Sequence, residues 1–143
     1  MRINEVLAGK GSRDVLTVAP DRTVRELVEV LAAHNGGALV VSGDGTSVDG
    51  IVSERDVVRR LDGDGDVLAA PVSSIMSTEV RTCEGPDTVV EVMALMTAGR
   101  FRHVPVVKDG QLVGIVSIGD VVKSRMSELE FERDQLDSYV HGS

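Results

Sequence analysis

Two stretches of the chain repeat one pattern: Gly50-Ile51-Val52-Ser53-Glu54-Arg55-Asp56-Val57-Val58-Arg59 and Gly114-Ile115-Val116-Ser117-Ile118-Gly119-Asp120-Val121-Val122-Lys123. In both, an apolar run ends at a Ser, and an Asp followed by two Val residues comes three positions later. The pattern predicts a strand that ends at the Ser and a closing helix that starts near the Asp. Because the copies match in order and spacing, the chain is expected to contain two copies of one structural unit.

The repeat continues upstream of this pattern. Residues 17–24 parallel residues 82–89, and in each stretch a Thr (Thr23, Thr88) stands three positions before a Glu (Glu26, Glu91), which is the signature of a helix-capping box. The helices predicted to follow have apolar residues at i, i+3, i+4 and i+7, the spacing of one helical face. These residues are Val24, Leu27, Val28 and Leu31 in the first copy, and Val89, Val92, Met93 and Met96 in the second.

Strands are predicted between these helices and the Ser-x-x-Asp turns. Extended pieces are expected around residues 15–18 and 80–83, and first hairpin strands at residues 38–41 and 104–107. The turns Gly43-Asp44-Gly45 and Asp109-Gly110 are hairpin signals. Each copy therefore has the order β-α-β-β-α. A unit of about fifty residues buries little surface alone, so we expect an α+β fold in which the two copies pack with approximate two-fold symmetry.

The resulting organisation has five parts. We expect an N-terminal segment (1–12), a first repeat (13–61), a linker (62–77), a second repeat (78–126) and a C-terminal helical extension (127–143). Residues 62–71 are rich in Gly and Asp and are expected to form a mobile loop, and residues 71–77 a short helical turn.

The closing helix of the second copy is predicted to continue toward the C-terminus. Val122, Met126, Leu129, Leu136 and Val140 recur at three-, four- and seven-residue steps, with Arg133 interrupting the pattern. Two interpretations are open: an exposed amphipathic helix that a partner helix covers, or a surface helix packed on its own core.

Composition excludes several classes of protein. The chain has 143 residues, 2% aromatic residues and a net charge of −8, which disfavours binding to a nucleic-acid polymer or an anionic membrane. No apolar run approaches the ~20 residues of a membrane helix. Cys83 is the single cysteine, so no intrachain disulfide can form. We expect a cytoplasmic protein.

The duplicated unit with its Gly-Ile-Val-Ser-x-x-Asp-Val-Val segments resembles a CBS domain, and the tandem resembles a CBS pair, or Bateman module. The resemblance covers roughly residues 1–126. Within the family the chain looks most like small stand-alone bacterial CBS-pair proteins, a likeness carried by residues 52–58 and 100–106. It implies a non-catalytic regulatory module, a homodimer that forms a disc of four repeats, and an adenine ligand in clefts between the repeats. The ligands implied are AMP first, then NAD(H), ATP, ADP or S-adenosylmethionine. A regulated partner protein is also expected.

The Ser-x-x-Asp turn has chemistry that suits such a ligand. A helix N-terminus favours phosphate, and a carboxylate there can accept hydrogen bonds from both hydroxyls of a ribose. The resemblance implies that the Asp holds ribose and the Ser helps to hold phosphate, which assigns these roles to Ser53 with Asp56 and to Ser117 with Asp120. The alternative is that both residues only cap the helix. The resemblance also implies that the adenine base lies between the extended segments and the first hairpin strands, with core strand residues as the alternative. The positions concerned are Thr17, Val18, Ala38, Leu39, Val40, Thr82, Cys83, His103, Val104 and Pro105.

Arginines make the two clefts unequal. Arg55 has Gly119 as its counterpart, whereas Arg100 and Arg102 correspond to Asn35 and Gly37. Arginine matches the geometry of phosphate, so these three arginines are candidate phosphate ligands, with solvated surface side chains as the alternative.

Other motifs do not support a catalytic or metal site. The run Asp62-Gly63-Asp64-Gly65-Asp66 lacks the Gly and Glu that a calcium loop requires at its sixth and twelfth positions. Residues 9–12 only partly resemble a phosphate-binding loop, although Lys10 could approach a phosphate. Neither repeat Ser lies in a Gly-x-Ser-x-Gly elbow. Besides a nucleotide-binding module, the sequence permits a pure interaction protein that has vestigial clefts and acts through its C-terminal helix.

Overall fold

The computed structural model describes residues 1–10, 15–34, 37–63 and 65–141. The first repeat comprises β1 (Thr17–Val18), α2 (Val24–His34), β2 (Ala38–Val41), β3 (Gly50–Ser53) and α3 (Glu54–Leu61). The second comprises β4 (Cys83–Glu84), α4 (Val89–Gly99), β5 (His103–Lys108), β6 (Gln111–Ser117) and α5 (Ile118–Val140). Helix α1 (Ile3–Ala8) precedes the first repeat, and two 3-10 turns, η1 (Val67–Ala69) and η2 (Val72–Ser74), join the repeats. The β-α-β-β-α order is confirmed in both copies.

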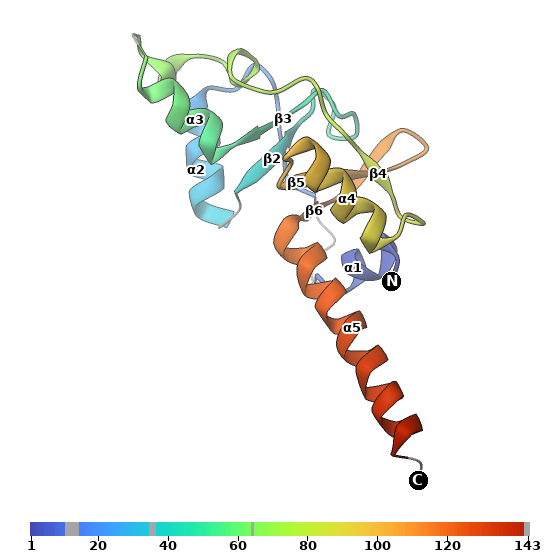
Figure 1. Cartoon of the computed structure of the whole chain (residues 1–143). Helices are drawn as coiled ribbons and strands as arrows, with labels where there is room; N and C mark the ends of the chain where they lie inside the picture. The colour runs from blue at the N-terminus through green and yellow to red at the C-terminus, as the bar shows by residue number, and fades with distance from the viewer. Residues whose placement is uncertain (11–14, 35–36, 64, 142–143) are drawn as a thin grey trace.

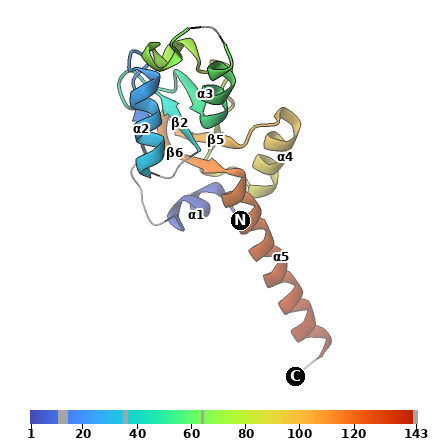
Figure 2. The ribbon, with the colours of Figure 1, turned by 90° about the vertical axis from the view of Figure 1, so that its left-hand side faces the viewer.

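Each repeat builds its own three-stranded sheet. The strand orders are β1-β2-β3 and β4-β5-β6, and in each sheet the short first strand pairs parallel to the middle strand while the hairpin is antiparallel. Asp109 and Gly110 both have positive φ, as a two-residue hairpin turn of this hand requires. The two sheets lie close together (Figures 1 and 2), and the backbone N–H of Leu112 donates to the carbonyl of Thr46 across them at 2.7 Å.

The predicted caps form. Thr23 Oγ1 accepts from the N–H of Glu26 at 3.2 Å, and Thr88 Oγ1 accepts from the N–H of Glu91 at 3.1 Å. The predicted helical faces are largely correct, but Val28 is 38% exposed. Val24, Leu27 and Leu31 fill the contact with the sheet, and Val30 packs at its edge.

Three other expectations need correction. Both extended pieces are shorter than predicted: Thr17–Val18 lies within the expected range 15–18, and Cys83–Glu84 runs one residue past the expected range 80–83. The closing helices begin at Glu54 and Ile118, two residues before the Asp, because the Ser is the N-cap. Residues 62–71 are not wholly a loop: Val67 and Leu68 lie in η1 and pack against the first core.

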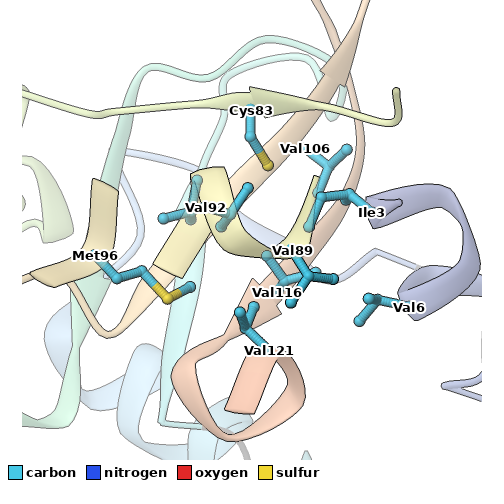
Figure 3. Close-up of a cluster of buried hydrophobic side chains, with 10 residues drawn as sticks. Ile3, Val6, Cys83, Val89, Val92, Met96, Val106, Val116 and Val121 are labelled. Atoms are coloured by element: carbon cyan, nitrogen blue, oxygen red, sulfur yellow. The ribbon is translucent and has the colours of Figure 1, made fainter. Parts of the chain in front are cut away.

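The core of each repeat is completed by a segment from outside that repeat: α1, before the first repeat, packs in the second core, and η2, before the second repeat, packs in the first core. Ile3 and Val6 of α1 are buried with Cys83, Val89 and Val106 in the second repeat's core (Figure 3). Val72 and Ile75 are buried in the first repeat's core in the same way.

The hydrogen bonds of these two segments correspond one to one. Ile3 N–H donates to Asp87 O and Val89 N–H to Met1 O, while Val72 N–H donates to Arg22 O and Val24 N–H to Ala70 O. The structural repeat therefore also includes residues 1–8 and 70–77, an exchange that the sequence analysis missed. The faint likeness of Ile3-x-x-Val6-Leu7 to Val72-x-x-Ile75-Met76 was the available signal.

Within the described ranges, none of the helices has the length and apolar character needed to cross a membrane.

Candidate ligand-binding site

The two Ser-x-x-Asp turns sit at the start of α3 and α5, where the last strand of each sheet ends. In the second repeat, Ser117 Oγ accepts from the N–H of Asp120 at 3.1 Å, and Asp120 Oδ2 accepts from the N–H of Ser117 at 2.9 Å. In the first, Asp56 Oδ2 accepts from the N–H of Ser53 at 2.8 Å and from its hydroxyl at 3.1 Å. Both Ser-Asp pairs therefore cap their helices, and whether they also bind a ligand stays a prediction. Within the described part of the chain, these hydrogen bonds use Oδ2 of each carboxylate, so Oδ1 can accept from a ligand.

The neighbouring strands bring the predicted base-side residues to these turns. Strand register pairs His103 with Ser117 and Ala38 with Ser53. The carbonyl of Arg102 accepts from the N–H of Ile118 at 2.8 Å, and the carbonyl of Gly37 accepts equivalently from Glu54 at 3.0 Å. Each turn is thus hydrogen-bonded to the residue that precedes the middle strand of its sheet.

Lys10, for which only an approach to a phosphate was predicted, contacts the second turn directly. Its Nζ donates to Asp120 Oδ2 at 2.8 Å and to the carbonyl of Ile115 at 2.9 Å. Partial burial would raise the pKa of the Asp120 carboxyl, but the hydrogen bonds from Lys10 and Ser117, with the charge of Lys10, lower that pKa below its usual value. No local pattern could have revealed this pair, because its members lie at opposite ends of the sequence.

The first repeat differs at the matching point. If the equivalence of residues 1–8 with 70–77 is extended by two positions, Glu79 beside the first repeat corresponds to Lys10 beside the second. An acidic side chain therefore replaces the basic one. The carbonyl of Ile51, the counterpart of Ile115, accepts instead from the backbone N–H of Ser77 at 2.9 Å. The two turns are therefore chemically distinct, and the cation lies at the second.

His103 lies where the repeats meet. A Cβ built on Gly37 would be 3.4 Å from His103 Cε1, so the imidazole rests against the first repeat. Burial lowers the pKa of His103, the positive charges of Lys10 and Arg102 lower it further, and Asp120 and Glu54 oppose the shift. Residues of both repeats thus act electrostatically on one place, and the imidazole is neutral at pH 7.

A cavity of about 860 Å³ opens beside this place. Its volume falls within the range typical of small-molecule sites. Both repeats and α1 line it, and among its lining residues are Lys10, Ala38, Leu39, Gly114 and Ile115. Of the predicted site residues, only Ala38 and Leu39 line the cavity; Lys10 connects it to Asp120.

The remaining predicted residues are distributed as follows. Five predicted residues are buried like Ala38 and Leu39 but, unlike those two, do not line the cavity: Val18, Val40, Cys83, Val104 and Pro105. Burial, with the charge of Asp87, raises the pKa of the Cys83 thiol to about 12, which makes it unreactive (Figure 3). Thr17 is half-buried; Thr82, Arg55, Arg100 and Arg102 are exposed. Arg100 caps α4 in the left-handed conformation, at φ 58°.

Three sequence features lie outside the described residues: Asn35, the proposed counterpart of Arg100, Asp64 of the calcium-like run, and residues 11 and 12 of the loop-like stretch. In the described part of the chain, no group of His, Cys, Asp and Glu is arranged to hold a metal ion.

Comparison with known proteins gives the family. A family model of the CBS domain matches residues 8–63 and again residues 72–127. The chain belongs to the CBS-domain family. Its fold of two tandem CBS repeats matches solved structures of CBS-domain proteins.

Three relatives define its neighbourhood. The CBS-domain containing protein ATU1752 from Agrobacterium tumefaciens is 45% identical, with a TM-score of 0.82 over 87% of this chain and 99% of that chain. The mitochondrial CBS domain-containing protein CBSX3 of Arabidopsis thaliana is 37% identical over 98% of this chain and 72% of its own length. The CBS domain protein PAE2072 from Pyrobaculum aerophilum, solved complexed with AMP, is 31% identical, with a TM-score of 0.73 over 84% of this chain and 89% of that chain.

Proposed function

We propose that this CBS pair is a non-catalytic sensor that binds AMP, or a related adenine nucleotide, beside the α5 turn. The carrying observation is the meeting of Ser117, Asp120, Lys10 and His103 at the junction of the two repeats. The AMP complex of the Pyrobaculum relative supports the ligand class.

The chemistry of these groups suggests their roles. Asp120 is ionised, so its carboxylate accepts hydrogen bonds from ribose hydroxyls once Lys10 gives up its place. Lys10, freed from Asp120, and Arg102 then supply positive charge to the phosphate. Neutral His103 and the apolar residues Ala38 and Leu39 offer a surface for the base. The weaker candidates ADP, ATP, NAD(H) and S-adenosylmethionine share the adenosine group.

Ligand binding has a structural consequence in this arrangement. Ribose at Asp120 competes with Lys10, which stands just after α1, and α1 packs in the core of the second repeat. A ligand that replaces this ion pair shifts the equilibrium between two arrangements of α1 and its neighbours. We propose that a regulated protein responds to that shift. We also propose that the module works as a homodimer in the cytoplasm, where the reducing environment keeps a single cysteine as a thiol.

Thermal unfolding with a ligand panel tests the proposal. AMP, ADP, ATP, NAD⁺, NADH, S-adenosylmethionine and adenosine are compared with GMP as the control. Ligand at one hundred times its Kd adds about 2.7 kcal/mol to the free energy of unfolding, so AMP should raise the Tm while GMP should not. The Asp56→Ala/Asp120→Ala double variant should lose the response. If no adenine compound at millimolar concentration shifts the Tm of the unaltered chain, the sensor function is wrong.

A second candidate function is an interaction module without a ligand. The exposed C-terminal half of α5 favours it, since residues 129–141 have no buried member. The same panel separates the two candidates, because a module with vestigial clefts responds to none of the nucleotides.

A further inference from the structure

His103 lies at the contact between the two repeats. It is the first residue of β5, it is half-buried, and strand register pairs it with Ser117. A Cβ built on Gly37 would lie 3.4 Å from Cε1 of His103 and 3.6 Å from its Nε2, so this edge of the ring faces the backbone of the first repeat. The carbonyl of Gly37 in turn accepts from the N–H of Glu54, the first residue of α3. The imidazole is therefore beside both Ser-x-x-Asp turns.

Four charged side chains of the described residues act on this ring, and each comes from a different part of the surrounding structure. They are Lys10 after α1, Arg102 before β5, Glu54 at the start of α3 and Asp120 in the first turn of α5. Two are positive and two are negative. Lys10 Nζ also lies 2.8 Å from Asp120 Oδ2, so these two charges oppose each other at the imidazole. With the charges balanced in this way, burial favours the neutral ring.

A bound phosphate group changes this balance in one direction. In the proposed binding mode the phosphate lies against Lys10 and Arg102, the same two cations that act on His103. A phosphate monoester carries a charge of about −1.5 to −2 at pH 7, so it offsets both positive charges. Asp120, released from Lys10, keeps its own negative charge beside the ring. Both changes favour the imidazolium.

We propose that nucleotide binding is linked to protonation of His103: a bound phosphate favours the imidazolium, and acid in turn strengthens the binding of phosphate. The second effect follows from the first, because the coupling between two binding events is reciprocal. This inference rests on the proposed function and adds that the sensor responds to nucleotide and pH together. Adenosine covers the ring without adding charge, so its binding should not show this linkage.

Proton NMR measures the linkage directly. The His34→Gln/His141→Gln variant keeps His103 as its only histidine, so a single imidazole Cε1–H resonance reports on it. Both replaced residues are exposed. Saturating AMP should raise the pKa of His103 by about one unit or more, whereas adenosine should leave that pKa unchanged or lower it.

The outcomes of this titration separate the linkage from the proposed function. If calorimetry shows that AMP binds but the pKa of His103 does not rise, the linkage is wrong and the sensor function stands. If AMP does not bind at millimolar concentration, both are wrong.

The pH dependence of affinity gives a second measurement. The phosphate of AMP itself takes up a proton near about pH 6, so the chain is compared with its His103→Gln variant, which shares that effect. The ratio of the two affinities for AMP should rise about twofold or more, in favour of the unaltered chain, between about pH 8 and pH 5.5. A constant ratio would rule out the linkage. If His103→Gln abolishes binding, the NMR titration decides.

Discussion

Lys10 Nζ lies 2.8 Å from Asp120 Oδ2, so the carboxylate proposed to hold ribose is occupied by a cation of the same chain. Both side chains are about one-third exposed or less, at 33% and 27%. The contact is therefore accessible enough for a ligand to replace. It links the segment after α1 to the first turn of α5.

Asp120→Ala should weaken AMP binding by about 1.5–3 kcal/mol, the usual range for hydrogen bonds to a charged group. Calorimetric titration measures the loss. Lys10→Met is the companion variant: adenosine should bind no worse, because Asp120 is freed, whereas AMP should lose the phosphate contact. A folded Asp120→Ala variant with unchanged affinity would disprove the ribose role.

Arg102→Ala should reduce the affinity for ATP or NAD(H) by about 1.5–3 kcal/mol and leave adenosine almost unaffected. Arg102 is exposed, so the loss should shrink as salt rises. Titrations of both ligands at low and moderate salt test this. Equal losses for adenosine and the nucleotide would mean that Arg102 supports the fold.

Gly50 and Gly114 should differ in their tolerance of a methyl group. A Cβ at Gly114 would lie 2.7 Å from Cδ2 of Leu7, a side-chain end, whereas one at Gly50 would meet both Met76 Sδ (2.7 Å) and the backbone oxygen of Ser77 (2.9 Å). Gly50→Ala should cost about 1–3 kcal/mol of unfolding free energy, and Gly114→Ala less. Leu7→Ala should offset the cost of Gly114→Ala in a double-mutant cycle measured by urea unfolding. Additive costs at these two positions would contradict the contact.

Acid should destabilise the chain through His103. Its folded pKa is lowered, so above the ordinary value near 6.5 both states are neutral, and below it the unfolded state takes up the proton first. The free energy of unfolding should therefore fall as pH drops from about 7 to 5.5. His103→Gln should flatten that slope, while His34→Gln, which changes an exposed residue, should not. A slope that is the same in all three proteins would show that His103 is not responsible.

Local signals predicted the fold because most of it is built from local rules. Thr23 and Thr88 mark the starts of helices because each caps a helix through a hydrogen bond to a residue three positions later. Asp109-Gly110 forms a hairpin turn because both residues adopt positive φ. Local rules could not predict that α1 packs on the second repeat and η2 on the first. The backbone hydrogen bond from Ile3 to Asp87 joins residues far apart in the sequence and produces no periodic pattern of side chains.

For the candidate site, too, local motifs could be predicted and long-range contacts could not. Ser117 with Asp120 was found because it repeats Ser53 with Asp56. Lys10 received no assigned role because its pairing depends on how α1 docks. The phosphate-binding role of the arginines stays a prediction. The base-binding role of five buried residues also stays a prediction, because their side chains pack in the core: Val18, Val40, Cys83, Val104 and Pro105.

The exchanged segments also set which parts of the chain should open together. The first repeat and its closing segment form one continuous stretch from residue 15 to residue 77, whereas the second repeat is closed by residues at the far end of the sequence. In native-state hydrogen exchange, the amides of Val6 and its neighbours in α1 should therefore exchange in step with those of Val92 and Val116, not with those of the adjacent Val18. Opening the second repeat would release α1 and, with it, the hold of Lys10 on Asp120.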